Sequence, residues 1–359
     1  MAYGIHKVDI SSWDSAQNKS VLTFYIKSNI TNKQAQYTSL LNNKNFLPFE
    51  NDSNIFNTEI IQLEKGAIFK IQTTINTPDK IEAFIEKQDK LLTFPLIKID
   101  IDKYASEMLS TYLFNDIQSC GFLIHADVIQ KYDFDFTPAV ILPDSVHNII
   151  STDSLCTVQT NKSFYDTTSM WISKQDSPLP DYKEYSKSNV YKLQPYGIPY
   201  RNDIIVSFSI EVNFDLNYCA IYTFNNKKSK WDFEETNIDT INSIISSKLS
   251  ESNICTVLED TIPPEFVFSY PWDNKTYALD TLKKFLITLH DDLSGIDLSE
   301  EYLQVFLDGK RIWVAYQPMD KEISYILRNA LSIGKHNLQI NIEDRSGNSA
   351  SKTIKFFVE

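Results

Sequence analysis

Apolar and polar residues alternate along much of this sequence, and that alternation constrains the fold more than any other feature. In the segment IIVSFSIEVNF (204–214) every second residue is apolar: Ile204, Val206, Phe208, Ile210 and Val212. Successive side chains of a β-strand point to opposite faces, so this spacing predicts a strand with one buried face. The runs YCAIYTF (218–224) and KFLITLH (284–290) are also typical of strands.

Short turns join several of these strands. The turn NNKKSK follows 218–224 and leads to Trp231 and Phe233, which predicts a hairpin. In EYLQVFLDGKRIWVAYQ (301–317), the pair Asp308-Gly309 suits the positive φ angles of a type I′ turn and predicts a second hairpin. Helical spacing is scarce. We expect one short helix within 101–114 and find a second helical pattern over 238–249.

Length and composition favour several packed β-domains. A chain of 359 residues exceeds one typical domain, and 42% hydrophobic residues are enough to fill several cores. Phe (22) and Tyr (19) are abundant while Gly (8) is rare, which favours packed strands over glycine-rich loops. We therefore predict an all-β chain of tandem β-sandwich modules that ends in an Ig-like domain and contains few short helices.

An internal repeat links the two ends of the chain. GIHKVDISSWDSAQNKS (4–20) aligns without gaps on GKHNLQINIEDRSGNSA (334–350). The identical pairs are Gly4/Gly334, His6/His336, Ile10/Ile340, Asp14/Asp344 and Asn18/Asn348. The pattern predicts a closing hairpin, with the aspartate capping the turn and the asparagine adopting the left-handed conformation there. We expect the chain to open on the tail of a truncated Ig-like domain and to close with a complete one.

The repeat and two proline-containing segments predict four parts: a terminal hairpin (1–27), two β-sandwich-like modules (28–143 and 144–259) and an Ig-like sandwich (260–359). The last boundary lies in LEDTIPP (258–264), where two prolines favour extended chain. The boundary near Pro143-Asp144 depends on the change in composition after FTPAVILPDS.

Charge argues against a nucleic-acid partner, because the formal net charge is −13 and no basic footprint is visible. The densest basic cluster, Lys227, Lys228 and Lys230, is either a solvated turn or a contact for an anionic surface. No apolar run reaches the roughly 18 residues that a membrane-spanning helix needs. The N-terminal segment MAYGIHKVDISSW lacks the features of a signal peptide.

The four cysteines Cys120, Cys156, Cys219 and Cys255 lie far apart and form no CxxC pair, which argues against zinc and thioredoxin-like sites. Three of them sit in apolar strand-like runs. We expect buried free thiols, with a disulfide as the alternative.

Two groups of residues could hold a metal. His125 and Asp127 share one face of a strand, but a third ligand is not identifiable, so we favour an exposed strand face over a metal site. The second group consists of the carboxylates Asp291, Asp292, Asp297 and Asp344, with Asp260 at the linker. Hard oxygen ligands at the end of an Ig-like domain could bind Ca²⁺, as in cadherin-like joints. We favour the interpretation that these aspartates cap turns in loops, keep Ca²⁺ as the weaker alternative, and assign no metal and no cofactor.

The sequence assigns no catalytic or cofactor-binding residue. It contains no G-x-S-x-G motif and no glycine-rich phosphate loop, and Cys120 lies near His125 only along the chain. With 47 acidic residues, chance pairs of carboxylates are inevitable, so sugar hydrolysis cannot be recognised. Aromatic side chains could instead stack on glycan rings, or fill cores: Trp171, Tyr191, Tyr196, Tyr200 and Trp313.

The order of these segments resembles the C-terminal, non-catalytic region of some M23-type (lysostaphin-like) metallopeptidases. In that region a hairpin and a β-domain precede a ZU5-like sandwich and an Ig-like domain. The resemblance therefore implies that the module 144–259 is a ZU5-like sandwich. The matching segments are 4–20, SFYDTTSMWISK (163–174), NVYKLQPYGIPYRNDIIVSFSI (189–210), YCAIYTFNNKKSKWDF (218–233), ICTVLEDTIPP (254–264), DLSGIDLSEEYLQVFLDGK (292–310) and GKHNLQINIEDRSGN (334–348). The peptidase domain itself would need H-x-x-x-D and H-x-H zinc ligands. All five histidines, His6, His125, His147, His290 and His336, fail both spacings.

This resemblance implies work at peptidoglycan or the cell surface, without catalysis. We expect a non-catalytic structural or interaction region of a bacterial periplasmic, cell-envelope or extracellular protein, which spaces or targets an associated peptidase-like activity. Its partner would be a cell-wall or cell-surface protein or glycan, and we expect a monomer. A glycan-binding adhesin is the alternative, and a hydrolase with an unrecognised site is a more distant one.

Overall fold

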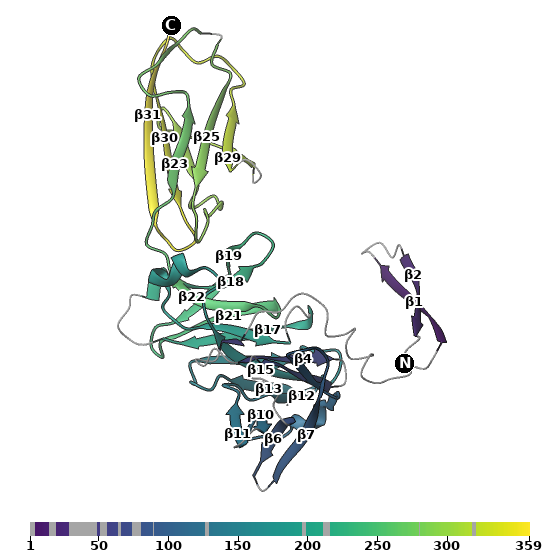
Figure 1. Ribbon diagram of the computed structural model, residues 1–359. Helices are drawn as coiled ribbons and strands as arrows, with labels where there is room; N and C mark the ends of the chain where they lie inside the picture. Colours follow the sequence, from purple (N-terminus) through teal and green to yellow (C-terminus); the bar gives the residue numbers. More distant parts are fainter. Residues whose placement is uncertain are drawn as a thin grey trace. The chain divides into compact units, whose positions relative to one another are not determined.

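The computed structural model describes residues 4–13, 19–28, 49–50, 56–63, 66–73, 80–88, 90–125, 129–195, 199–210, 216–279, 281–317 and 321–359. The chain is all-β and consists of tandem β-sandwich modules that end in an Ig-like domain, which confirms the predicted fold class. It divides into two compact units, 1–134 and 135–359, which are described separately (Figure 1). Among the described residues, no helix has the length and apolar character needed to cross a membrane.

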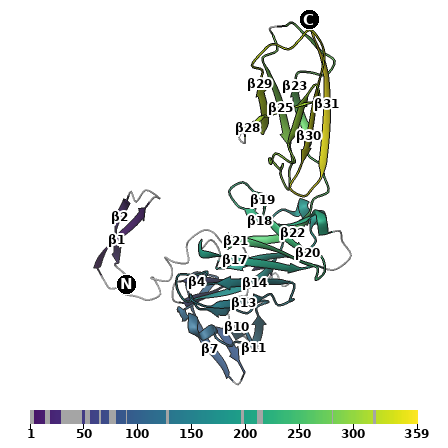
Figure 2. The same ribbon diagram turned by 180° about the vertical axis from the view of Figure 1, so that it is seen from behind.

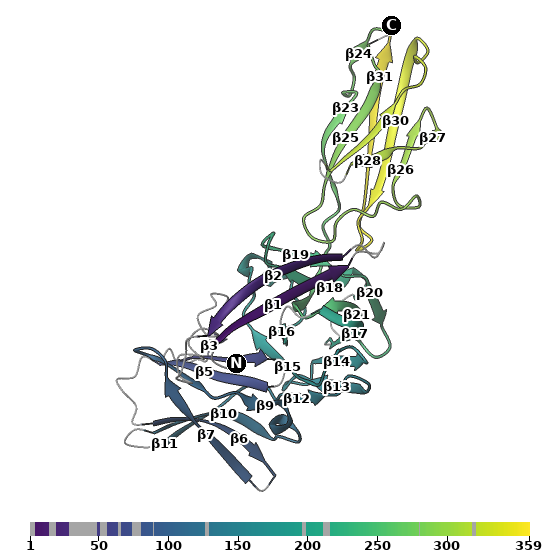
Figure 3. The same cartoon turned by 90° about the vertical axis from the view of Figure 1, so that its right-hand side faces the viewer.

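The two copies of the repeat form hairpins of identical register. Strands β1 (Gly4–Trp13) and β2 (Lys19–Ser28) pair from Gly4↔Ser28 to Trp13↔Lys19 (Figure 3). Strands β30 (Gly334–Glu343) and β31 (Ser349–Val358) pair from Gly334↔Val358 to Glu343↔Ser349. Every pair in the first hairpin therefore maps onto one in the second through the sequence alignment, and the predicted hairpins are confirmed.

The rest of the first unit is one nine-stranded sheet in the order β11-β10-β6-β7-β8-β5-β4-β3, with β9 paired to β5. The strands are β3 (Phe49–Glu50), β4 (Phe56–Leu63), β5 (Gly66–Thr73), β6 (Lys80–Lys87), β7 (Lys90–Lys98), β8 (Lys103–Ser106), β9 (Leu109–Ser110), β10 (Ser119–His125) and β11 (Ile129–Asp133). Three strands separate β5 from β10, yet the rings of Phe69 and Phe122 lie 6.0 Å apart. The sheet therefore folds back on itself around an aromatic core.

The prediction of a helix within 101–114 is wrong except for the last turn, residues 111–114. This segment forms β8, β9 and the 3₁₀ helix η1 (Thr111–Phe114). Tyr104 and Ala105 pair with β5 and are buried. The apolar spacing that imitated a helix thus arises from a strand, a short bridge and a turn in succession, because pairing with β5 outweighs local preference.

The first sandwich of the second unit consists of two sheets (Figure 2). The six-stranded sheet has the order β12-β15-β16-β22-β18-β19, with β12 (Ala139–Ile141), β15 (Thr168–Gln175), β16 (Val190–Gln194), β18 (Cys219–Asn225), β19 (Lys230–Phe233) and β22 (Ile254–Glu259). The five-stranded sheet has the order β13-β14-β17-β21-β20, with β13 (Val146–Ile150), β14 (Cys156–Asn161), β17 (Pro199–Ser209), β20 (Thr236–Asp239) and β21 (Ile244–Glu251). Because β12 pairs with β15, the six-stranded sheet includes residues that precede the predicted boundary at 144.

Both faces of the six-stranded sheet are apolar. Its inner face, with Tyr191 and Ile221, packs on Val206 and Phe208 of β17 in one continuous core. The outer face carries a second buried cluster: Val190, Ala220, Tyr222, Phe224, Trp231, Ile254 and Leu258. Residues near the 3₁₀ helix η2 (Pro180–Tyr185) and Leu293 of the Ig-like domain pack against this cluster. The short 3₁₀ helix η3 (Leu216–Tyr218) precedes β18.

The helical pattern over 238–249 is also wrong, because this segment is a hairpin. Strands β20 and β21 pair through Ile238↔Ile245. The Asp239 carboxylate accepts hydrogen bonds from the backbone N–H groups of Ile241 and Asn242, and so closes the turn. In β21 the buried residues are Ile245, Ser247 and Leu249, which follow the period of two.

The Ig-like domain has two sheets around a separate core. One has the order β23-β25-β29-β28, with β23 (Glu265–Tyr270), β25 (Lys284–His290), β28 (Ala315–Gln317) and β29 (Glu322–Ile326). The other has the order β24-β31-β30-β26-β27, with β24 (Thr276–Tyr277), β26 (Gln304–Leu307) and β27 (Lys310–Ile312). The parallel pair β24–β31 brings the start of the domain to its last strand.

Both predicted turns are confirmed. Asp308 and Gly309 join β26 to β27 with φ angles of 50° and 77°, as a type I′ turn requires. The lysine-rich turn joins β18 to β19 and is exposed. There the Asn225 side chain accepts hydrogen bonds from the backbone N–H groups of Lys227 and Lys228, while Lys230 pairs with Asp232 at 2.9 Å.

All four cysteines are buried and free.

The separate core of the Ig-like domain leads to a first prediction. An expressed fragment 260–359 should unfold in one cooperative thermal transition followed by circular dichroism, because its apolar residues pack on one another. In this fragment Ile340→Ala should lower the free energy of unfolding by about 2–5 kcal/mol, since Ile340 is fully buried. Ile333→Ala is the matched control; its side chain is exposed, and its effect should stay within about 0.5 kcal/mol. A fragment without a cooperative transition would contradict the prediction.

Candidate metal centre

Three aspartates that are distant in sequence meet at one point of the second unit. Asp260, Asp291 and Asp344 each place a carboxylate oxygen so that the three atoms lie within 4.8 Å of one another. Asp260 directly follows β22, Asp291 follows β25 and Asp344 follows β30. The group thus combines the linker after the first sandwich with the ends of two strands of the Ig-like domain.

Asp291 is held by its own turn. Its Oδ1 accepts hydrogen bonds from the backbone N–H groups of Leu293 and Gly295. Gly295 has a φ angle of 76°, which a side chain would strain, so the residue type suits this turn. Among the described residues, the second oxygen, Oδ2, has no hydrogen-bond donor. One carboxylate oxygen therefore orients the side chain, and the other is free to bind a ligand.

Asp344 and Asn348 lock the turn between β30 and β31. Asp344 Oδ1 accepts hydrogen bonds from the backbone N–H groups of Ser346 (2.9 Å) and Asn348 (2.8 Å), and Oδ2 accepts one from Asn348 Nδ2 (2.8 Å). The predicted turn cap is confirmed. The prediction that Asn348 adopts the left-handed conformation is wrong, because Gly347 is the residue with the positive φ angle, 91°. Asn348 Nδ2 instead also donates to the Asp260 carbonyl oxygen at 2.8 Å.

Asp260 bonds to both modules of the second unit. Its N–H donates to the Tyr218 carbonyl of the first sandwich at 2.9 Å. Its Oδ2 accepts from the Ser294 N–H of the Ig-like domain at 3.0 Å, and its Oδ1 accepts from the Ile262 N–H at 3.1 Å. The side chain is 1% exposed. The linker is thus fixed at this residue by hydrogen bonds on both sides.

The three aspartates form no ion pair with a basic group within the described part of the chain. No lysine or arginine there forms an ion pair with the three aspartates, and the Arg345 guanidinium lies over the Phe233 ring, 5.5 Å from its centroid. Burial raises the pKa of Asp344 to about 6, and the charges of Asp260 and Asp291 add to this effect. Burial also raises the pKa of Asp291, again helped by Asp260. The fold therefore concentrates negative charge where it is poorly solvated.

Buried hydroxyls surround the carboxylates. The Tyr222, Ser294 and Ser346 hydroxyls are buried and form no hydrogen bond of good geometry within the described residues. Burial raises the pKa of the Tyr222 phenol; Ser346, which lies near it, lowers that pKa, and the charges of all three aspartates raise it further. The phenol oxygen thus lies within the electrostatic reach of the whole cluster.

Two carboxylates of the predicted calcium group lie outside this cluster. Asp292 is exposed and pairs with His290 at 2.8 Å. Asp297 Oδ1 accepts a hydrogen bond from the Ser299 N–H at 2.8 Å and so caps a turn. Asp260, which the sequence places at the linker, belongs to the cluster together with Asp291 and Asp344.

Only His125 of the second candidate metal pair lies among the described residues. His125 Nε2 contacts Glu82 Oε2 at 2.8 Å, and the two residues belong to neighbouring strands, β10 and β6. Asp127 lies outside the described residues. Burial raises the pKa of the Cys120 thiol, which disfavours the nucleophilic thiolate.

Most of the aromatic residues proposed to bind glycans belong to cores. Trp171, Tyr191 and Tyr200 are buried. Trp313 is 63% exposed, but the Arg311 guanidinium covers one face of its ring at 4.5 Å. Tyr196 lies outside the described residues. The described members of this set therefore form no shared aromatic platform.

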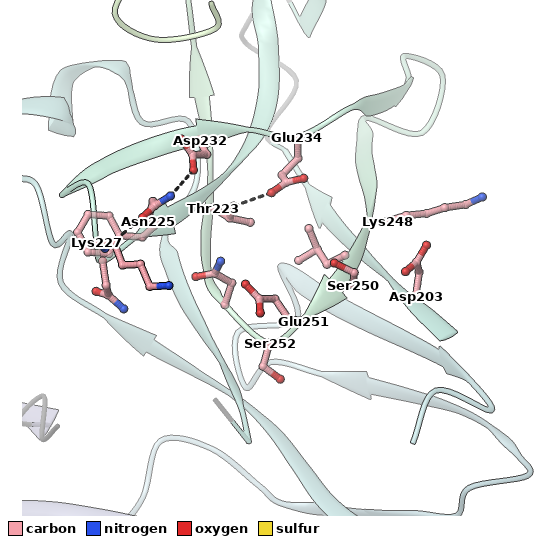
Figure 4. A pocket seen from close by; sticks show the side chains of 14 residues that line it. Asp203, Thr223, Asn225, Lys227, Asp232, Glu234, Lys248, Ser250, Glu251 and Ser252 are labelled. Atoms are coloured by element: carbon pink, nitrogen blue, oxygen red, sulfur yellow. Dashed lines mark hydrogen bonds between the residues drawn. The ribbon is translucent and has the colours of Figure 1, made fainter. Parts of the chain in front are cut away.

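A polar pocket lies on the first sandwich (Figure 4). It lies beside β18, β19 and β21, and its labelled side chains include Glu234, Glu251 and Lys248. Thr223 Oγ1 donates to Glu234 Oε1 at 2.6 Å, and Asn225 Nδ2 donates to Asp232 Oδ2 at 2.7 Å. These polar groups satisfy one another, unlike the hydroxyls around the three aspartates.

No family model matches the chain, and no curated protein matches it. Among solved structures, it is similar to CopC from Methylosinus trichosporium OB3b (15% identity, TM-score 0.22, 27% of this chain and 93% of that one). It is also similar to PorU from Porphyromonas gingivalis (10% identity, TM-score 0.23, 86% of this chain and 23% of that one). A third similar structure is the extracellular domain of the hybrid two-component system BT3049 from B. thetaiotaomicron (9% identity, TM-score 0.23, 97% of this chain and 49% of that one). These scores identify no family, so the resemblance to M23-associated regions stays a prediction.

The raised pKa of Asp344 leads to a second prediction. In the presence of a chelator, the ¹³Cγ shift of Asp344, assigned with Asp344→Asn, should titrate with a midpoint at about 6. Asp153 is the internal control. Burial there opposes ionisation, but hydrogen bonds from Ser151 and Tyr191 outweigh it and lower the pKa to about 2. A midpoint for Asp344 at or below the usual value of about 3.9 would contradict the geometry of the cluster.

The same shift fixes the sign of a stability change. Because the folded pKa of Asp344 is raised, this group stabilises the cation-free fold below about pH 4 relative to neutral pH, and that stabilisation is lost as the pH rises through about 6.

Proposed function

We propose that the chain is a non-catalytic structural and interaction region of a bacterial cell-envelope or secreted protein. In this role it spaces or targets a peptidoglycan-peptidase-like activity carried by an associated domain or protein. The resemblance of its segments to M23-associated regions motivates the choice of activity. The construction of the joint between its last two modules supports the choice of role.

The observation that carries this proposal is the linkage at Asp260. A spacer holds its partner in position only if the joints between its modules resist bending. Asp260 donates its N–H to Tyr218 of the first sandwich, and its carbonyl and carboxylate accept hydrogen bonds from Asn348 and Ser294 of the Ig-like domain. A single linker residue is thus bonded to both modules, and Pro263 and Pro264, which stiffen the chain, follow after Thr261 and Ile262.

Apolar contacts add to these hydrogen bonds. Leu293 packs against the outer cluster of the six-stranded sheet, which includes Tyr222 and Leu258. Arg345 lies over the Phe233 ring of the same sheet. Both contacts come from the loops that hold Asp291 and Asp344. The two modules therefore share a small packed surface in addition to the covalent linker.

Two of the histidines have structural partners, which supports a non-catalytic role. His336 is bonded to Asp308 and to the Ser332 carbonyl, each at 2.7 Å. His147 Nε2 accepts a hydrogen bond from the Leu142 N–H. The glycan-binding alternative is less well supported, because three of its five aromatic residues are buried.

The joint gives a third prediction. Spin labels on Ile241→Cys and Val267→Cys, both at exposed positions of the two modules, should give one narrow distance distribution in double electron–electron resonance. The native cysteines are buried and should stay unlabelled. Asn348→Ala should broaden the distribution, because it removes the bond to Asp260, whereas Asn337→Ala on an exposed position of β30 should not. A broad distribution in the unmodified joint would rule out the spacer role.

The fourth prediction concerns hydrolysis. Peptidoglycan incubated with the purified chain and zinc should release no more soluble fragments than with heat-denatured chain, because the H-x-x-x-D and H-x-H ligand spacings are missing. Release that depends on zinc and stops with a chelator would show a catalytic site and refute the proposed role.

A further inference from the structure

We propose that Asp260, Asp291 and Asp344 bind a calcium ion that ties the linker to the two adjacent loops of the Ig-like domain. Each residue contributes one carboxylate oxygen, and the three oxygens lie within 4.8 Å of one another. The three come from separate segments, so only the folded second unit assembles the site.

The charge of the cluster is the first argument. Asp260 and Asp344 are almost fully buried, and none of the three carboxylates has a basic partner among the described residues. The nearest arginine in sequence, Arg345, is directed over the Phe233 ring. Buried charges are normally paired or coordinate a metal ion. A divalent cation supplies the missing positive charge at the point where the three oxygens converge.

The hydroxyls are the second and independent argument. Tyr222 is fully buried, its hydroxyl has no hydrogen bond of good geometry within the described residues, and it lies within the electrostatic reach of all three aspartates. Two serines are placed directly by hydrogen bonds: the Ser294 N–H donates to Asp260 Oδ2 at 3.0 Å and the Ser346 N–H donates to Asp344 Oδ1 at 2.9 Å. Their hydroxyls are also buried and have no hydrogen-bond partner among the described residues. Buried hydroxyls on residues that contact the carboxylates, and that lack a protein partner, suit an ion and its bound waters.

The ligand types favour Ca²⁺. All of the groups are oxygens, which suit Ca²⁺ or Mg²⁺, and no histidine or cysteine joins the cluster. Mg²⁺ demands near-ideal octahedral geometry and usually keeps several waters, with only one or two protein carboxylates. Ca²⁺ accepts flexible geometry and several carboxylates, as three aspartates from separate segments provide.

Asp291→Asn is the sharpest test, because of how Asp291 is held. An asparagine retains the Oδ1 that accepts hydrogen bonds from Leu293 and Gly295, so the turn should survive. The change replaces only the second oxygen, which has no donor, and removes one negative charge. Asp297→Asn is the matched control; it alters an aspartate that caps a turn in the same loop but lies outside the cluster.

The experiment is a calorimetric titration of CaCl₂ into the chelator-treated full chain, with the thermal transition measured in parallel. We expect one Ca²⁺ per chain and a higher transition temperature with CaCl₂. Asp291→Asn should weaken binding at least about tenfold, the range that altered metal-site contacts produce, and Asp297→Asn should leave it unchanged. In the chelator, Asp291→Asn should unfold at a temperature no lower than the unmodified chain, which separates loss of the ion from misfolding.

Three results would overturn the assignment. They are no binding at millimolar CaCl₂, binding that persists in Asp291→Asn, and an equally strong response to MgCl₂. The calorimetric result does not depend on the spacer role. If the chain binds Ca²⁺ but gives a broad spin-label distance distribution, the calcium site stands and the spacer role falls. If the distribution is narrow but Ca²⁺ does not bind, the spacer role stands and the calcium site falls.

Discussion

A β-sheet that is apolar on both faces must be covered twice, and this constraint determines how the second unit is built. The inner face of the six-stranded sheet packs on the five-stranded sheet. Its outer face also carries large buried side chains, including Trp231 and Tyr222, and exposing them would cost about 25 cal/mol per Å². Residues around η2 and Leu293 of the Ig-like domain cover that face. The loop of Leu293 also carries Asp291, so covering the sheet brings carboxylates to a buried position.

Much of the strand content could be predicted from the period of two, because alternating burial is a local property of each strand. The two failures share one cause. The segments 101–114 and 238–249 contain apolar residues at helical spacing, but each consists of short strands separated by a turn, and the turn residues complete the apparent helical pattern. Which pattern prevails depends on pairing partners such as β5, which are distant in sequence.

The site was predictable only in part. Asp291 and Asp344 were expected near one end of the Ig-like domain, because each follows a strand, whereas Asp292 and Asp297 were indistinguishable from them by composition. Hydrogen bonding separates them: Asp292 pairs with a histidine in solvent, and Asp297 caps a turn. The role of Tyr222 could not have been found from the sequence, since only the outer face of a neighbouring sandwich brings its hydroxyl to the cluster.

The repeat indicates which contacts matter most within the Ig-like domain. The two copies share His6/His336, Asp14/Asp344 and Asn18/Asn348. In the second copy, His336 is bonded to Asp308, and the pair Asp344 and Asn348 closes its turn and reaches Asp260. These bonds leave the hairpin and fix it to the domain and to the preceding linker. A side chain that only closed a turn could be exchanged for other turn residues, whereas Asn348 must satisfy the turn and the linker together. Asp14 and Asn18, the counterparts in the first copy, lie outside the described residues, so this double role is established for the second copy.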